Sequence, residues 1–255
     1  MKTFIINLEE EVERREKITN QCQRHNLNYQ LIKAVNGKAL PQPVVSAVTA
    51  NYPACGLTQG EIGCALSHLA VYAAIVSENL NCALILEDDA ILDADLQKYL
   101  NSIEFHINNQ RPEIYILSAV DACNKSITRK LGQDITFYRL AYGSCAHGYI
   151  INKAAAQALR KYNLPVRFEA DQWTLFRDLC GIYIWCLDKE IISTSDPDKI
   201  SSALEKDRRE SSMLRGKAIK KLKKEVKWYQ LKRIKNVLIN KFGGKQQNGS
   251  STAYR

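Results

Sequence analysis

The hydrophobic positions of the chain form two kinds of pattern, short apolar runs and stripes with helical spacing. Residues 82–86 are a continuous apolar run of strand length, which is typical of a central strand covered on both faces. Similar strand-like runs lie at residues 4–8, 29–35, 114–117, 135–140, 148–151, 182–187 and 191–194. Because predicted strands and helices are interleaved, we expect an α/β fold with a central, mostly parallel sheet flanked by helices.

Helical segments separate these runs. A charged helix is predicted after the first strand, through about His25. Thr58 is predicted to cap a second helix, because its hydroxyl can bond the backbone three residues on while Glu61 bonds back. Asn152 is predicted to cap an alanine-rich helix that runs to about Tyr162. The second helix carries apolar residues at a 3.6-residue period: Ile62, Ala65, Leu66, Leu69, Ala73 and Val76.

The C-terminal part of the chain has a different charge and pattern. Of the 36 Lys and Arg, residues 1–205 hold 20 against 24 Asp and Glu, and residues 206–255 hold 16 against 3. Apolar residues recur every three or four positions from Leu214 to Phe242, with lysines between them and Gly243-Gly244 as a predicted end. We therefore divide the chain into a catalytic domain (1–205), a basic amphipathic helical tail (206–244) and a disordered C-terminus (245–255).

Composition narrows the class of protein. Apolar residues make up 45% and charged residues 25%, an ordinary globular balance. No uncharged apolar run approaches the ~20 residues that span a bilayer, and the opening MKTFIINLEE lacks the pattern of a signal peptide. The 8 cysteines contain no C-x-x-C pair, so we expect buried thiols in a reducing cytosol and no disulfide framework.

An acidic triplet, Glu87-Asp88-Asp89, follows directly on the apolar run 82–86. Ligands of open α/β sheets bind outside the carboxyl ends of strands. In an extended segment Glu87 and Asp89 would point to one side, where a divalent cation would relieve their repulsion. The alternative from the residues alone is a solvated acidic turn or a helix start.

The motif string resembles glycosyltransferase family 25, the family of bacterial lipooligosaccharide galactosyltransferases. The resemblance rests on residues 57–68 (LTQGEIGCALSH) and 85–90 (ILEDDA), with residues 4–8, Arg14-Arg15, residues 34–37 and residues 147–151 in support. It covers about residues 1–195. It implies a GT-A-like nucleotide-sugar fold, metal-dependent inverting transfer, and UDP-galactose as the sugar donor.

Glycosyl transfer gives these residues expected roles. Glu87 and Asp89 are the expected ligands of Mn²⁺ or Mg²⁺, which would neutralise the leaving diphosphate. Asp171 is the expected general base, with Glu169 as its rival, because a base must reach the acceptor hydroxyl. An exposed helix-start acid is the alternative for both. The remaining expected contacts to the sugar donor are Asn7, Arg14, Arg15, His68, Asp88 and His147.

The alternatives for these contact residues are structural. The two arginines could pair with Glu10, Glu11 and Glu13, and His68 could be a buried structural histidine.

Partners and location follow from the tail and the resemblance. We expect a glycolipid acceptor, no nucleic acid, and binding of the tail to an anionic membrane at the cytoplasmic face of the bacterial inner membrane. Alternatively the tail stripe packs on the catalytic domain or on a second copy in a homodimer. Two rival functions remain, a basic-tailed membrane- or nucleic-acid-binding protein, and a nucleotidyl- or phosphotransferase that uses the same triplet, although no P-loop or kinase motif is present.

Overall fold

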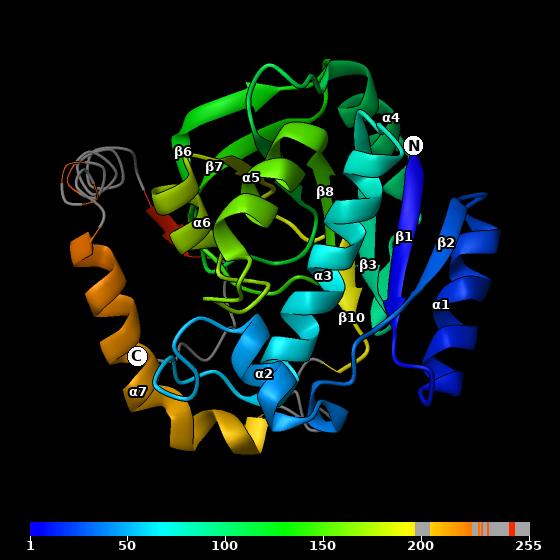
Figure 1. The fold of residues 1–255 in the computed structure, drawn as a ribbon. Helices are drawn as coiled ribbons and strands as arrows, with labels where there is room; N and C mark the ends of the chain where they lie inside the picture. Colours follow the sequence, from blue (N-terminus) through cyan, green and yellow to red (C-terminus); the bar gives the residue numbers. More distant parts are fainter. Residues whose placement is uncertain (197–204, 226–228, 230, 232–233, 235–244, 248–255) are drawn as a thin grey trace.

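A computed structural model describes residues 1–196, 205–225, 229, 231, 234 and 245–247. In this part of the chain nine strands form one sheet in the order β11-β6-β7-β9-β5-β8-β3-β1-β2 (Figure 1). The strands are β1 (Lys2–Asn7), β2 (Asn28–Lys33), β3 (Cys82–Glu87), β5 (Glu113–Ile116), β6 (Ala122–Lys130), β7 (Thr136–Tyr142), β8 (Gly148–Asn152), β9 (Tyr183–Cys186) and β11 (Lys245–Gln247). A second small sheet pairs β4 (Ala90–Leu92) with β10 (Ile192–Thr194).

The sheet is mixed in direction. β1 pairs in parallel with β2 and β3, and β5 pairs in parallel with β9. β8 runs antiparallel between β3 and β5, so it joins the two parallel parts. β6 and β7 extend the sheet by antiparallel pairing. The predicted α/β fold with a central helix-flanked sheet is confirmed. The longest run of adjacent parallel strands is β2-β1-β3.

Helices cover both faces of the sheet. They are α1 (Val12–Arg24), α2 (Gln42–Val48), α3 (Gln59–Ser77), α4 (Leu96–His106), α5 (Lys153–Asn163), α6 (Trp173–Cys180) and α7 (Glu205–Glu225), with a short 3₁₀ turn η1 at Gly37–Ala39. Strand residues alternate between two cores: Ile85 packs with α3, α5 and α6, whereas Leu84 and Leu86 pack with α1 and α4. Because both faces are covered, β3 is apolar at consecutive positions, as its sequence predicts.

The predicted caps form. Thr58 and Glu61 make the capping box of α3, and Asn152 caps α5 by accepting a hydrogen bond from the N–H of Ala155 at 2.9 Å. Among the described helices, α3 is long and apolar enough to cross a membrane by length and composition. However, 56% of its most apolar window is buried, and it packs between the sheet and α5 as a core helix.

The tail helix packs on the catalytic domain. Ile219 and Leu222 of α7 pack against the core that also contains α3 residues. Tyr229, which follows α7 in the chain, is buried in the same core. Residues 217, 220, 221 and 224, all lysines, are exposed on the opposite side of the helix. A membrane-bound tail helix would need a free apolar stripe. In the structure, part of that stripe packs against the rest of the chain.

Beyond α7 the structure describes residues 229, 231 and 234, each of them helical. The rest of the predicted tail helix to Phe242 and its Gly243-Gly244 end lie outside the described residues. Residues 245–247, in the segment for which we expected no order, form β11 beside β6.

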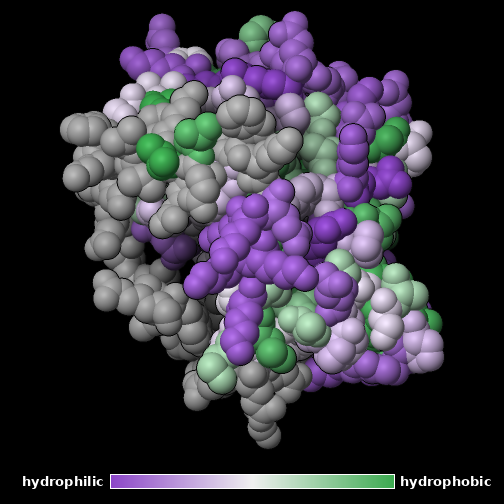
Figure 2. Space-filling model, turned by 60° about the vertical axis from the view of Figure 1, so that its left-hand side comes forward, coloured by the Kyte–Doolittle hydropathy of each residue, from purple (hydrophilic) through white to green (hydrophobic). Residues whose placement is uncertain are grey.

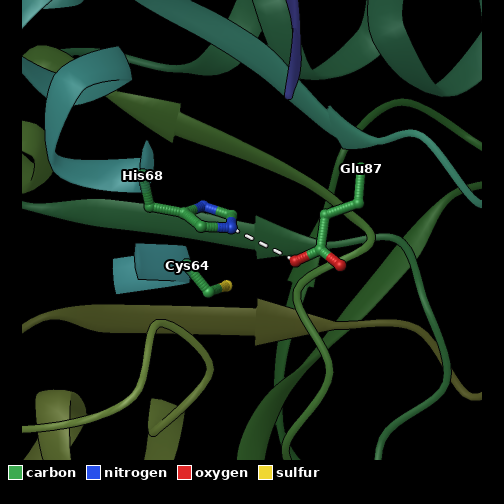
Figure 3. Close-up of side chains that lie close together, drawn as sticks. All are labelled: Cys64, His68 and Glu87. Carbon is green, nitrogen blue, oxygen red and sulfur yellow. Dashed lines mark hydrogen bonds and ion pairs between the residues drawn. The ribbon is translucent and has the colours of Figure 1, made fainter. Parts of the chain in front are cut away.

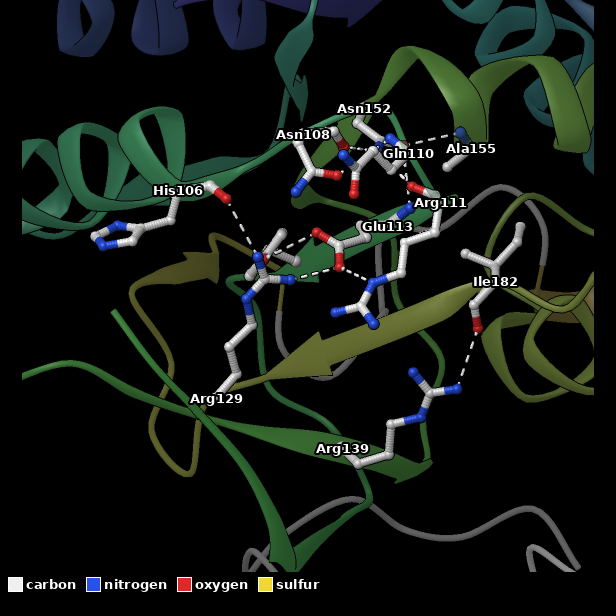
Figure 4. A network of polar contacts seen from close by, with 11 residues as sticks. His106, Asn108, Gln110, Arg111, Glu113, Arg129, Arg139, Asn152, Ala155 and Ile182 are labelled. Atoms are coloured by element: carbon white, nitrogen blue, oxygen red, sulfur yellow. Dashed lines mark hydrogen bonds and ion pairs between the residues drawn. The ribbon is translucent and has the colours of Figure 1, made fainter. Parts of the chain in front are cut away.

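A buried polar network closes the end of the sheet where β5 begins. Glu113 is fully buried and pairs with Arg111 Nε at 2.7 Å and with Arg129 (Figure 4). Asn152 accepts the N–H of Glu113 at 3.0 Å and donates to the carbonyl of Asn108 at 2.6 Å. Because β3 and β5 are both antiparallel to β8, this network lies at the opposite end of the sheet from Glu87.

Candidate functional site

The acidic triplet lies where β3 ends, beside the end of β1. Glu87 is the last residue of β3 and is opposite Ile6 of β1. Asp88 and Asp89 form a turn between β3 and β4, so the extended geometry expected for residues 87–89 does not hold. As a result the three carboxylates point to three different sets of neighbours.

Asp88 borders the end of β1 and the start of α1. Its carboxylate accepts a hydrogen bond from Asn7 Nδ2 at 2.8 Å and pairs with Arg14 at 3.5 Å. Burial raises the pKa of Asp88, and Asn7 and Arg14 act against this rise. A cleft of about 850 Å³ lies beside these groups and is lined by α1, the β3–β4 turn and Ser195. Arg14 and Asp88 thus line a cleft large enough for a small ligand, and Asn7 holds the Asp88 carboxylate beside it.

Asp89 faces the second small sheet. One of its carboxylate oxygens accepts a hydrogen bond from Thr194 at 2.8 Å, and the other, Oδ1, is buried and has no hydrogen-bond partner among the described residues. Burial and the charge of Glu87 raise the pKa of Asp89. His147, whose backbone carbonyl accepts the N–H of Glu87 at 3.2 Å, is also buried. Its Nε2 has no hydrogen-bond partner in the part of the chain that the structure describes.

These groups have the chemistry that a hard divalent cation prefers. A partnerless buried carboxylate oxygen beside a second carboxylate is costly unless a positive charge or hydrogen-bond donor compensates it. Glu87 and Asp89 offer the oxygen ligands that Mg²⁺ and Mn²⁺ prefer, and His147 offers a nitrogen beside them. The predicted metal ligands are therefore chemically suited to the ion.

Glu87 is held by a line of aromatic and polar side chains, of which His68 contacts it directly (Figure 3). His68 Nε2 lies 3.2 Å from Glu87 Oε1, and His68 Nδ1 lies 2.7 Å from the hydroxyl of Tyr149. The Tyr149 hydroxyl lies 2.7 Å from that of Tyr72. His68 is 1% exposed, so its contact with Glu87 is fixed by burial and by Tyr149.

Asp171 and Glu169, the two candidate bases, have different environments. Asp171 is partly exposed, and its carboxylate accepts the N–H of Cys145 at 3.1 Å. Cys145 has a positive φ of 74°, a strained conformation of a kind that clusters at functional sites. Glu169 is 5% exposed and pairs with Arg215 of α7 at 2.6 Å. Burial raises the pKa of Glu169 to about 7, while Arg215 lowers it.

The structure brings most of the predicted residues to one edge of the sheet. Asn7, Arg14, Asp88, Glu87, His68 and Asp89 are joined by direct contacts or charge interactions, and the 143–147 loop connects His147 to Asp171. Arg15 instead donates to the carbonyl of Glu9 at 3.2 Å. Tyr149, Thr194 and Arg215 were missed. Tyr149 lies in the family-like segment 147–151 but was given no role, and Thr194 and Arg215 are distant in sequence and belong to no local motif.

Comparisons with known proteins identify the family of this chain. The family model described as glycosyltransferase family 25 (LPS biosynthesis protein) matches residues 1–174, which include β1, α3 and the acidic triplet.

Curated relatives match over a similar part of the chain. Procollagen galactosyltransferase 2 of Homo sapiens is 25% identical over 173 residues, covering 61% of this chain and 26% of that protein. Procollagen galactosyltransferase 1 of Danio rerio is 29% identical over 175 residues, covering 62% of this chain and 28% of that protein. A putative glycosyltransferase of Haemophilus influenzae is 29% identical over 99 residues, covering 38% and 35%. The chain thus spans about a quarter of the length of the procollagen relatives.

Among solved structures, a glycosyltransferase involved in the glycosylation of the major capsid of PBCV-1 is 10% identical with a TM-score of 0.43. That match covers 83% of this chain and 98% of the other.

Proposed function

Because the chain belongs to glycosyltransferase family 25, we propose that it transfers a sugar from a nucleotide-diphosphate donor to a hydroxyl group of a glycan acceptor. The observation that carries this proposal is the acidic triplet at the end of β3, beside a cleft that is lined by Arg14 and by Asp88, whose carboxylate Asn7 holds. We propose galactose from UDP-galactose as the donor and a lipooligosaccharide or LPS glycan as the acceptor. The family description and the galactosyltransferase names of the relatives support this choice.

The cleft residues suit a nucleotide diphosphate. Arg14 is partly exposed beside Asp88 and can form charge-assisted hydrogen bonds to phosphate oxygens. Asp88 can accept hydrogen bonds from ribose or sugar hydroxyls, with Asn7 holding its orientation. A Mn²⁺ or Mg²⁺ ion held by Glu87 and Asp89 would supply Lewis-acid stabilisation of the leaving diphosphate. His68 fixes the Glu87 carboxylate through the 3.2 Å contact.

Transfer with inversion requires a base on the acceptor side. The acceptor oxygen attacks the anomeric carbon as the bond from that carbon to the diphosphate oxygen breaks. The acceptor proton passes to the base, for which we propose Asp171, a carboxylate beside the strained Cys145. Glu169 is less suited to this role, since its carboxylate is buried against Arg215.

We propose that the enzyme works at the cytoplasmic face of the bacterial inner membrane. The exposed lysines of α7, at positions 217, 220, 221 and 224, lie on one side of the helix because they are three or four residues apart. Figure 2 shows the molecule with the α7 side of Figure 1 turned forward. Hydrophilic residues, in purple, form much of the surface that is not grey in this view. Charge attraction to anionic headgroups, at about 1 kcal/mol per basic residue, therefore suits this helix better than insertion of an apolar stripe.

Donor turnover tests the reaction class. The full chain incubated with UDP-galactose is expected to release UDP slowly, with stimulation by Mn²⁺ and loss of activity in EDTA, and to leave ATP intact. Asp89→Asn should lower UDP release by ~10²-fold or more, because it removes a charged ligand of the cation that would stabilise the leaving diphosphate. Asp95→Asn, at an exposed acid beyond β4, is the matched control and should retain turnover. Near-normal UDP release by Asp89→Asn in EDTA-treated buffer would contradict the proposal, and turnover of ATP alone would point to a phosphotransferase.

A further inference from the structure

Cys64, His68 and Glu87 bring three different metal-ligating groups together. Cys64 and His68 are four residues apart on α3, so they lie on the same side of that helix, and Glu87 approaches from the end of β3 (Figure 3). One ligand atom from each residue lies within 4.8 Å of the other two. The sulfur of Cys64 and Nε2 of His68 both point toward the Glu87 carboxylate.

We propose that these residues form a Zn²⁺ site, separate in chemistry from the oxygen site expected for the sugar donor's cation. Thiolate and imidazole ligands favour Zn²⁺ over Mg²⁺ or Mn²⁺, which prefer carboxylate, carbonyl and water. Three protein ligands leave the fourth tetrahedral position for a water molecule. Binding removes the thiol proton of Cys64, so one proton is released to solvent for each ion bound.

The ligand atoms are close to the required spacing. A tetrahedral ion with bonds of about 2.0–2.3 Å separates its ligand atoms by roughly 3.3–3.6 Å. His68 Nε2 and Glu87 Oε1 are already 3.2 Å apart, and the widest separation in the cluster is at most 4.8 Å. The Glu87 side chain is 30% exposed at the end of its strand, so rotation of its side chain can close the remaining gap.

The tyrosine pair behind His68 prepares the ring for a metal. To bind the ion through Nε2, the imidazole must carry its proton on Nδ1, which faces the Tyr149 hydroxyl at 2.7 Å. Tyr149 then accepts from Nδ1 and donates to Tyr72, and in the metal-free protein the same two hydroxyls donate in the opposite direction. Either tautomer therefore keeps its hydrogen bond, as in sites where an outer partner fixes a ligating histidine.

The site has a consequence that depends on the proposed function. Glu87 cannot serve Zn²⁺ and the donor's cation with the same oxygens, so Zn²⁺ is expected to compete with Mn²⁺ and inhibit sugar transfer. Metal binding itself does not depend on that function, and it is measured first.

The test uses the full chain freed of metal by a chelator and titrated with Co²⁺. We expect one equivalent to produce a thiolate-to-cobalt charge-transfer band in the near ultraviolet, which Zn²⁺ then removes by displacement. Cys64→Ser should abolish the band and weaken Zn²⁺ binding in calorimetry by at least ~10-fold, whereas Cys180→Ser, at another partly exposed cysteine, should retain both. Tyr149→Phe should weaken Zn²⁺ binding ~10- to 100-fold while keeping the band, since the thiolate remains.

Two results would overturn the site: no band in the unmodified chain, or a band that persists in a folded Cys64→Ser. If Cys64→Ser is unfolded by circular dichroism, unchanged Zn²⁺ affinity in Tyr149→Phe overturns the site and the predicted loss supports it. If the cobalt charge-transfer band appears but the protein does not transfer sugar, the result supports the Zn²⁺ site and contradicts the proposed function. Zn²⁺-insensitive transfer with the band present overturns only the competition.

Discussion

Glu169 and Asp171 are two residues apart, yet their carboxylates are suited to different tasks. Glu169 is buried with Arg215, and one of its oxygens has no hydrogen-bond partner within the described ranges. Asp171 is partly exposed and held by one backbone N–H in the loop that continues to His147. The local sequence is equally acidic at both positions, so only the packing of α7 separates a structural carboxylate from a candidate base.

Substitution of these two acids is expected to affect different quantities. Asp171→Asn should lower kcat by ~10²–10⁴-fold with little change in the donor KM, because it removes a proton acceptor and preserves shape. Glu169→Gln should keep kcat within a few-fold. Steady-state kinetics with a soluble acceptor measures both, and the opposite pattern would assign the base to Glu169.

Glu169 also predicts a pH dependence of stability. Its pKa is raised from 4.5 to about 7 by burial, so between these values the folded protein holds a proton that the unfolded chain has released. The stability from this group is complete below pH 4.5 and is lost as pH rises through 7, by on the order of 3 kcal/mol. Denaturant titrations from pH 5 to 8 should show this loss, and Glu169→Gln should remove it. An equal slope in both proteins would contradict the assignment.

α7 is joined to the catalytic domain by one arginine as much as by apolar packing. Arg215 pairs with Glu61 and Glu169, each at 2.6 Å, and donates to the carbonyl of Gly56 at 3.1 Å. Glu61 is also the capping-box residue of α3, the helix that carries Cys64 and His68. The tail helix thus helps to fix the start of the helix that positions the site.

Loss of Arg215 should be costly for this reason. Arg215→Ala leaves two buried carboxylates without their cation, and we expect a destabilisation of about 3 kcal/mol or more. Lys217→Ala, on the exposed side of α7, should change stability by no more than ~0.5 kcal/mol. Urea unfolding followed by circular dichroism makes the comparison. Equal stability of both variants would show that α7 does not depend on this ion cluster.

The molecule places chemistry and structural reinforcement at opposite ends of its sheet. The acidic triplet and cleft lie where β3 ends, and the Glu113 network lies where β5 begins (Figure 4). Positive charge gathers on a third region, the exposed side of α7. The proposed membrane contact therefore uses a surface separate from the residues of the proposed reaction.

Charge reversal on α7 tests that contact more cleanly than truncation, which would also remove Arg215. The triple variant Lys217→Glu, Lys221→Glu and Lys224→Glu should lose at least about 3 kcal/mol of binding to anionic vesicles, a fall of more than 100-fold. The control triple, Lys98→Glu, Lys130→Glu and Lys161→Glu, reverses exposed lysines of the catalytic domain and should still float with the vesicles. Flotation at low salt decides, and failure of the unmodified protein to bind would leave α7 as a structural helix.

The local sequence patterns correctly predicted the features that depend on neighbouring residues, namely helix caps and a buried strand. The capping box at Thr58, the Asn152 cap and the buried strand β3 formed as predicted because short-range hydrogen bonds and consecutive apolar residues specify them. β6 was missed, since its buried half is brief and its outer half alternates polar and partly buried positions.

Contacts between residues that are distant in the sequence could not be predicted from it. Gly37 lies in the family-like segment 34–37, and nothing in the local sequence indicates a close backbone contact there. In the fold a side chain there would meet the Gln59 carbonyl at 1.8 Å, and one at Gly63 would meet the Val35 carbonyl at 2.5 Å. Such close backbone approach, like the Arg215 cluster and the hydroxyls behind His68, depends on tertiary packing that no local spacing encodes.

The place of β8 in the sheet has a consequence for the order in which the chain folds. β1, β2 and β3 can pair as soon as the first 87 residues have been synthesised. β5, made next, has no place in the sheet until residues 148–152 arrive, because β8 separates it from β3. One edge of β3 and both edges of β5 therefore stay without a neighbouring strand until β8 has been made. Unpaired strand edges are prone to pair with other chains. Slow translation between residues 116 and 148 would lengthen the interval in which nascent chains are most prone to aggregate.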